Sequence, residues 1–301
     1  MNHIERGVTA IGLNYIDSII FDLLKKSYEV YKAKDFSKKQ SSVSINENKY
    51  ASAGIVLVAI GIESYRNLIF YGEIEKITRS VADDFCRILK KKDKNIPTDF
   101  IKDSIIELFI VRDIIVHSHV YRGLRKFDND SNLISERYTL LKDQYGDRKL
   151  FLYSNSRTKK TNTNRLNIQP IRIGFEDYFK ILIILDMLIG IISKYWGKNI
   201  VRYHPLFEID NYWFPNLAEL YAYFYDRIPN DAFKRSLKKI IINIRKSYLP
   251  FMESSDSFID NICWVCNEPG FKKQNRVYSC LKCGNKVEFS STYTKIYQGK
   301  P

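Results

Sequence analysis

The sequence predicts a mainly α-helical protein, in which a helical bundle is interrupted by a small β insertion and followed by a small metal-binding module. Several long segments carry apolar residues at the spacing of one helix face. Gly, Asp and Asn/Thr runs break residues 123–172 into short segments. Two Cys-x-x-Cys pairs lie near the C-terminus. We therefore expect a helical domain at 1–198 with its insertion at about 123–172, a helical extension at 199–258 and a metal module at 259–301.

Four helices are expected before the insertion. Ser80 precedes the third and can cap it, because a serine oxygen accepts an N–H of the first helical turn. Thr98 precedes the fourth, which is expected to continue to about Tyr121. A polar, Ser/Asn-rich loop at 35–49 separates the first two. The four helices are expected at 8–33, 50–75, 81–92 and 99–121.

The insertion is expected to form a small sheet or a long hairpin, and helices return after it. Short segments bounded by turn-forming residues are typical of strands. The expected strands are 134–141, 149–155 and 166–173. The expected later helices are 175–197, 213–227 and 230–248.

No segment indicates a membrane span or an export signal. The most apolar run, 180–196, is short for a span and carries Asp186 near its middle, which favours a core helix. The first residues contain Glu5 and no cleavage site made of small residues. We therefore expect a cytoplasmic protein with no membrane partner.

The net charge of +14 and the pI of about 9.3 predict attraction to polyanions, of which nucleic acid is the commonest. An alternative is that AT-rich codons alone enriched the chain in Lys, Asn, Ile and Tyr. The basic runs 87–94 and 156–165 are interpreted as solvated surface.

Four of the five cysteines form a pattern typical of a zinc site. Thirteen residues separate the two Cys-x-x-Cys pairs, and two such turns can direct four thiolates at one ion. Gly284 suits the tight turn after the last cysteine. The segments 276–280 and 286–297 alternate like the strands of a ribbon around the site. A site closed by four thiolates is structural, and a redox dithiol pair or an iron–sulfur centre is the alternative. The expected ligands of this zinc ribbon are Cys263, Cys266, Cys280 and Cys283.

The zinc ribbon is a candidate surface for nucleic acid. Cations beside an aromatic side chain can contact phosphates while the ring stacks on a base. The alternative is that Trp264 packs against the bundle. The candidate RNA-binding cations of the ribbon are Lys272, Lys273 and Arg276.

An apolar segment at 104–121 contains Arg112, Asp113, His117 and His119. Charged groups are costly in a core unless they are paired, so they are either satisfied internally or exposed for a purpose. In a regular helix Asp113 and His117 share a face, whereas Arg112 and His117 are about 140° apart around the axis. A long arginine side chain, or a cleft between two such helices, would bring the two groups together.

The spacing of Arg112 and His117, in 112-RDIIVH-117 near the end of an apolar helix, resembles the HEPN superfamily. The motif of that family is Arg, a polar residue, three residues and His, on a late helix of a helical bundle. An earlier helix often carries an acid, which Glu63 in 58-VAIGIESYRNLIF-70 resembles. The resemblance covers about 8–122 and 175–197.

The resemblance implies a metal-independent endoribonuclease that acts as a homodimer, with both copies of Arg112 and His117 in one cleft. Imidazole exchanges protons near neutral pH, so His117 can take a proton from the 2′-hydroxyl of RNA or give one to the leaving 5′-oxygen. Arg112 can bind the phosphate, and Asp113 can orient either group. The product would carry a 2′,3′-cyclic phosphate, and no catalytic metal is expected.

Two interpretations are open for each of Glu63 and His119. Glu63 belongs either to the catalytic cleft or to a structural pair with an arginine or a hydroxyl. His119 either helps to bind RNA or is a hydrogen-bonded structural residue. The family implies a role as a toxin or in anti-phage defence, with a neutralising or activating partner.

Two other classes of function are consistent with the sequence. One is a non-catalytic nucleic-acid-binding or regulatory protein, in which the bundle dimerises and the ribbon and the basic helix at 230–248 bind nucleic acid. The other is an interaction module with no role in nucleic-acid binding.

Overall fold

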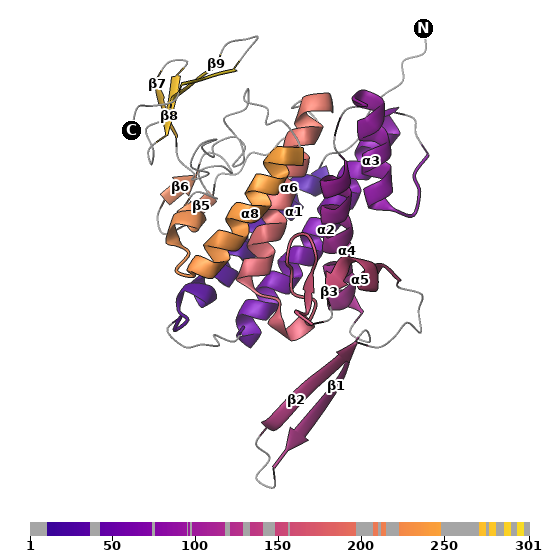
Figure 1. The fold of residues 1–301 in the computed structure, drawn as a ribbon, viewed down its shortest axis with the longest axis vertical. Helices are drawn as coiled ribbons and strands as arrows, with labels where there is room; N and C mark the ends of the chain where they lie inside the picture. Colours follow the sequence, from indigo (N-terminus) through magenta and orange to yellow (C-terminus); the bar gives the residue numbers. More distant parts are fainter. Residues whose placement is uncertain are drawn as a thin grey trace.

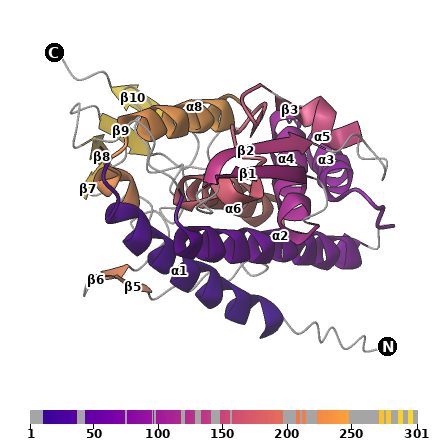
Figure 2. The same ribbon diagram turned by 90° about the horizontal axis from the view of Figure 1, so that it is seen from below.

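The computed structural model is mainly helical, as the sequence predicts (Figure 1). The same bundle is seen from below in Figure 2. The structure describes residues 11–36, 43–73, 76–94, 96, 98–117, 121–128, 133–140, 148–155, 157–196, 207–209, 212–214, 223–247, 271–274, 277–280, 286–289 and 294–297.

The four helices expected before the insertion are confirmed, but the second begins at Ile45, inside the loop expected at 35–49. The Ser80 hydroxyl caps the third by accepting a hydrogen bond from the Asp83 N–H (3.2 Å). The fourth ends at Val116 rather than near Tyr121, because Tyr121 already belongs to a strand. The helices are α1 (Ile11–Lys32), α2 (Ile45–Glu73), α3 (Val81–Lys92) and α4 (Asp99–Val116).

The insertion begins with a hairpin of β1 (Tyr121–Phe127) and β2 (Leu133–Leu140), which extends away from the bundle (Figure 1). The strands are antiparallel, with Tyr121 opposite Leu140. The strand expected at 134–141 is therefore confirmed, and its partner strand lies in a segment that the sequence did not mark as a strand.

The other two expected strands are wrong. Residues 149–155 form mostly helix α5 (Arg148–Tyr153), which packs on α4 with Leu150 buried, because so short an apolar segment fits either period. Residues 166–173 contribute one isolated bridge at Asn167 and then a 3₁₀ turn, since Pro170 has no N–H for a ladder. The remaining elements here are β3 (Ser154–Asn155), β4 (Lys160–Thr161) and η2 (Pro170–Arg172).

Helix α6 (Phe175–Trp196) is the centre of the core, and α8 (Asp231–Ser247) covers part of it. One hydrophobic cluster joins residues from Ile20 in α1 to Ile244 in α8, so the described part of the extension shares its core with the bundle. The helices predicted at 175–197 and 230–248 are therefore confirmed.

The helix expected at 213–227 is wrong at its start. The hairpin of β5 (Phe207–Ile209) and β6 (Tyr212–Phe214) pairs Ile209 with Tyr212, and helix occupies 223–227. Asp210 and Asn211 separate the paired residues, and Asp and Asn favour two-residue hairpin turns. This turn signal outweighs the helical spacing of the aromatic residues.

Helix α2 is long and apolar enough to cross a membrane by length and composition alone, and it passes this test alone among the described helices. More than half of its apolar stretch is buried inside the protein. Arg66 of the same helix is buried against an aspartate of α3, as expected for a core helix.

The C-terminal strands form a four-stranded antiparallel sheet in the order β10-β9-β8-β7. Strands at 276–280 and within 286–297 are expected from alternation and are confirmed, whereas β7 was not anticipated. The strands are β7 (Phe271–Gln274), β8 (Val277–Cys280), β9 (Lys286–Phe289) and β10 (Thr294–Tyr297).

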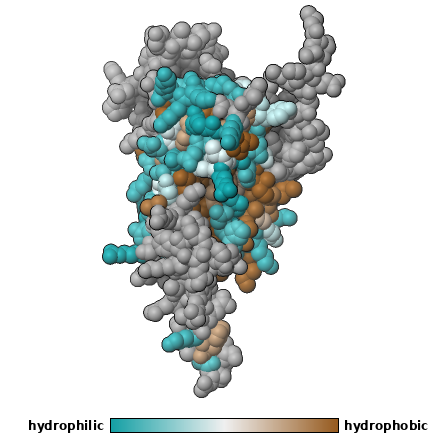
Figure 3. Space-filling model, turned by 90° about the vertical axis from the view of Figure 1, so that its right-hand side faces the viewer, coloured by the Kyte–Doolittle hydropathy of each residue, from teal (hydrophilic) through white to brown (hydrophobic). Residues whose placement is uncertain are grey.

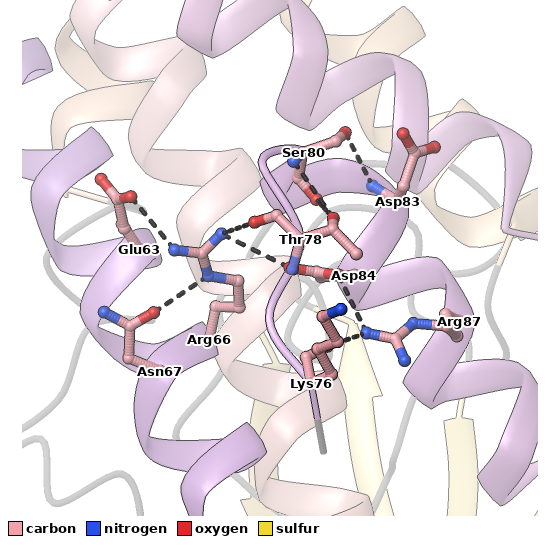
Figure 4. A network of polar contacts seen from close by, with 9 residues as sticks. All are labelled: Glu63, Arg66, Asn67, Lys76, Thr78, Ser80, Asp83, Asp84 and Arg87. Atoms are coloured by element: carbon pink, nitrogen blue, oxygen red, sulfur yellow. Dashed lines mark hydrogen bonds and ion pairs between the residues drawn. The ribbon is translucent and has the colours of Figure 1, made fainter.

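A buried carboxylate, Asp84, joins α2, α3 and the segment between them (Figure 4). Its Oδ1 accepts from Arg87 Nη2 (3.0 Å). Its Oδ2 accepts from the Thr78 N–H (3.0 Å) and lies 3.4 Å from Arg66 Nη1. All of these donors compensate the desolvation of one charge, so losing the carboxylate would remove the buried charged partner of Arg66 and leave it paired with the part-exposed Glu63.

We expect Asp84→Ala to lower the free energy of unfolding by about 3–5 kcal/mol, because it breaks a buried pair. The matched control is Asp83→Ala, whose exposed ion pair with Lys102 (2.8 Å) is worth about 0–1 kcal/mol. Urea denaturation measures both. Equal losses in the two variants would show that Asp84 does not hold α2 to α3.

Candidate functional site

Helix α4 is buried over most of its surface and becomes exposed in its last turn. Its middle residues, including Ile105, Leu108 and Val111, are fully buried. The side chains of Arg112 and Asp113 are 32% and 36% exposed. The polar residues that looked costly in an apolar segment therefore lie where the helix reaches solvent, and within Arg112 the Nε atom is buried without a hydrogen bond.

Arg112 is held by contacts within its own helix. Its Nε lies 2.9 Å from Asp113 Oδ1 without hydrogen-bond geometry, so the contact is an ion pair. Its guanidinium carbon lies 4.9 Å from the ring centroid of Phe109, one turn earlier, in a cation–π contact. Together these contacts restrict the guanidinium to the exposed end of α4.

His117 is the C-cap of α4 and is exposed. Its backbone N–H donates to the Asp113 carbonyl (2.7 Å), and its φ of −108° and ψ of 81° leave the helical path. The bond to Asp113 keeps the His117 nitrogen on the helical path, and the chain leaves that path only after it. The motif thus straddles the end of the helix, while His119 lies outside the described residues.

The structure gives Glu63 a partner other than Arg112 or His117. Its Oε1 accepts from Arg66 Nη2 (3.1 Å), and its side chain is 43% exposed (Figure 4). The interpretation of Glu63 as an acid paired with an arginine agrees with this contact, although the acid is not buried. Glu63 extends the network around Asp84.

Glu107, one and a half turns before Arg112, is a buried acid that the sequence analysis did not single out. Its carboxylate accepts from the N–H groups of Thr163 (2.6 Å) and Asn164 (2.7 Å) and from Asn164 Nδ2 (3.0 Å). Burial raises the pKa of Glu107, and these donors oppose that shift. The sequence feature that could have identified Glu107 is its position between Ile106 and Leu108 in an apolar helix.

Large apolar side chains are exposed at several places in the described part of the chain, one of them at the end of α4. Val116, beside His117, is 51% exposed. Figure 3 shows hydrophobic residues gathered along one flank of the face that it presents. Surfaces of this kind are often covered by a partner. The large exposed hydrophobic residues of the described ranges are Ile19, Ile45, Ile60, Tyr71, Ile77, Val116, Phe127, Leu152 and Ile171.

The expected zinc ligands are only partly within the described residues. Cys280 ends β8, while Cys263, Cys266 and Cys283 lie outside the described ranges. Within those ranges no group of three or more His, Cys, Asp or Glu residues is placed to hold a metal. Of the candidate RNA-binding cations, Lys272 and Lys273 belong to β7 and Arg276 lies outside the description.

The fifth cysteine is structural. Cys86 is buried, with its sulfur 3.7 Å from the Thr98 carbonyl oxygen. Burial raises the pKa of its thiol to about 11, which disfavours the thiolate that a metal requires.

No protein-family model, curated protein or solved structure matches this chain. The chemistry of its own side chains is therefore the basis for a functional assignment.

We expect Glu107→Gln to lower the free energy of unfolding by about 1–3 kcal/mol, because one amide oxygen cannot serve every N–H that both carboxylate oxygens now accept. The control is Glu63→Gln, an exposed acid with one arginine partner, for which the change should stay below about 1 kcal/mol. Urea denaturation at neutral pH compares the two. Equal stability of Glu107→Gln and the wild type would contradict the anchoring role of Glu107.

Proposed function

We propose that the chain is a metal-independent endoribonuclease of the HEPN type that acts as a homodimer. The observation that carries the proposal is the placement of Arg112, Asp113 and His117 at the exposed last turn of an otherwise buried helix. A guanidinium and an imidazole at such a site supply an anion-binding group and a proton-transfer group without a metal.

The chemistry follows from RNA, which carries a 2′-hydroxyl beside each phosphate. His117 removes the proton of the 2′-hydroxyl or donates one to the leaving 5′-oxygen. The 2′-oxygen attacks phosphorus, the bond to the 5′-oxygen breaks, and the products carry a 2′,3′-cyclic phosphate and a 5′-hydroxyl. Arg112 stabilises the charge that develops on the phosphate oxygens. DNA lacks the nucleophile and remains uncut.

Asp113 has a positioning role in this proposal. Its ion pair with Arg112 Nε fixes one edge of the guanidinium. Its carbonyl accepts the His117 N–H and sets where the chain leaves the helix. Glu63 receives no chemical step, because its contact is with Arg66.

The homodimer is proposed because one chain presents only one copy of each group. Phe109 is partly buried, and Val116 beside the motif is half exposed, so a second copy placed along this turn would cover apolar surface. The same contact would bring two copies of Arg112 and His117 to one groove. A role as a toxin or in anti-phage defence, with a neutralising or activating partner, is part of the proposal and rests on the HEPN resemblance.

We expect the purified protein to cut single-stranded RNA in the presence of EDTA, and Arg112→Ala or His117→Ala to reduce the rate by at least about a hundredfold. The matched controls are Arg79→Ala and His204→Ala, which remove the same kinds of side chain elsewhere in the chain. Gel electrophoresis measures the rate, and mass spectrometry of the fragments should show cyclic phosphate ends.

Wild-type rates in both motif variants would refute the proposal. Binding of RNA without cleavage by the wild type would favour the non-catalytic nucleic-acid-binding alternative.

We also propose that Cys263, Cys266, Cys280 and Cys283 hold a structural zinc ion. Four thiols in two Cys-x-x-Cys pairs are the donor set that Zn²⁺ prefers for closed sites. The position of Cys280 at the end of β8, which pairs with β9, supports this proposal, because Cys283 is only three residues further along the chain. Bound zinc would join this pair to Cys263 and Cys266 and stabilise the sheet.

Elemental mass spectrometry should find about one zinc per chain, and Cys263→Ser should lower this content because a closed site loses a ligand. Cys86→Ser is the control and should keep the metal, since its buried thiol contacts Thr98. Iron, or no metal at all in the purified wild type, would contradict the zinc assignment.

A further inference from the structure

Residues 157–165 carry four cations and no acid. Arg157 and Arg165 are exposed, and Lys159 and Lys160 are partly exposed. Among the residues that the structure describes, no carboxylate forms an ion pair with any of the four. Like charges this close repel one another, so the segment gains from an anion that neutralises them.

Hydrogen bonds make this cationic segment, which we call the 157–165 loop, a defined structure. Asn155 Oδ1 accepts from the N–H groups of Arg157 (2.9 Å) and Thr158 (3.1 Å). The Lys159 carbonyl accepts from the Ile168 N–H (3.0 Å), which closes the base of the loop. A pre-ordered loop loses little conformational entropy when it binds a ligand.

Two buried charged side chains fix the 157–165 loop to the bundle. Glu107 of α4 binds the backbone of Thr163 and Asn164, as described above. Lys180 of α6 is buried and donates to the Arg165 carbonyl (3.1 Å). The loop is therefore attached to the helix that carries Arg112, about 7.5 Å along the axis from that residue at 1.5 Å per residue.

Two cations of the loop have an unfavourable backbone conformation. Lys159 has φ 56° and Arg165 has φ 58°, and they are the two non-glycine residues with positive φ in the described part of the chain. This region costs residues with a Cβ about 1–2 kcal/mol and is occupied mainly by Gly, Asn and Asp. A glycine or asparagine would form the same backbone turn with less strain. The presence of Lys and Arg at both positions therefore indicates that their positive charge has a function.

We infer that the 157–165 loop binds the phosphate backbone of RNA and positions it for the motif at the end of α4. The loop offers four cations to successive phosphates, and its anchor Lys180 lies 5.8 Å from the Phe233 ring of α8, a helix on which Arg235 and Lys239 are exposed. The choice of RNA among polyanions rests on the proposed function. The binding of RNA by the loop depends on the charges of the loop and does not require that the protein cleaves the RNA.

The test uses a single-stranded 2′-O-methyl oligoribonucleotide of mixed sequence, which cannot be cut because its 2′-oxygen is blocked. Fluorescence anisotropy measures its affinity over a salt series for the wild type and for Arg157→Gln/Lys159→Gln/Lys160→Gln/Arg165→Gln. We expect the variant to bind at least about tenfold more weakly. Its salt slope should fall by about 0.7 for each phosphate that the loop no longer neutralises.

The control variant, Lys76→Gln/Arg79→Gln/Lys90→Gln/Lys94→Gln, removes the same number of exposed charges from α3 and its flanks. It should keep nearly the wild-type affinity and slope. Equal weakening in both variants would show that net charge alone attracts RNA and would overturn the inference. Binding of polyglutamate in preference to RNA by the loop would also overturn the inference, because the loop would then recognise carboxylates rather than phosphates.

The inference and the proposed function can fail separately. Cleavage of ordinary RNA with unchanged affinity in the loop variant would overturn only the inference. Loop-dependent binding of the oligoribonucleotide, together with wild-type rates for His117→Ala, would overturn only the nuclease.

Discussion

The carboxylate of Glu107 connects the two surfaces on which the proposals depend. It is buried in α4, and it accepts hydrogen bonds from the backbone of Thr163 and Asn164, far along the chain. Burying an acid is costly unless its oxygens are satisfied, and here N–H donors on the loop satisfy them. The same contact fixes a basic loop to the helix whose end bears Arg112 and His117. The position of the basic loop relative to the end of α4 therefore depends on the hydrogen bonds that satisfy this one buried carboxylate.

The helical elements were predictable because their signals are long and consistent. Apolar periodicity identified α1 to α4, α6 and α8, and Ser80 identified the start of α3. Short segments gave too few periods to separate helix from strand, so α5 was expected as a strand. The end of α4 was placed too late because apolar residues continue past Val116, whereas the start of β1 determines where the helix stops.

The candidate site was predictable in its residues but less so in its contacts. The spacing of Arg112, Asp113 and His117 identified the motif, and the exposed end of α4 is where a surface function would need it. The partner of Glu63 depends on Arg66 and Asp84, which come together only through the packing of α2 on α3. Likewise, the run at 156–165 looked like ordinary solvated surface. Its anchors lie on α4 and α6, and no local sequence pattern reveals them.

The β1–β2 hairpin has a consequence for self-association. Each strand of a two-stranded ribbon has one outer edge with unsatisfied N–H and C=O groups, which can template the addition of another extended chain. Natural proteins protect such edges with charge, and β1 carries Arg122, Arg125 and Lys126 within its seven residues. A cation on an edge strand disfavours the pairing of another extended chain along that edge, and Lys126 is exposed on β1. This lysine therefore disfavours self-association of the protein through its hairpin.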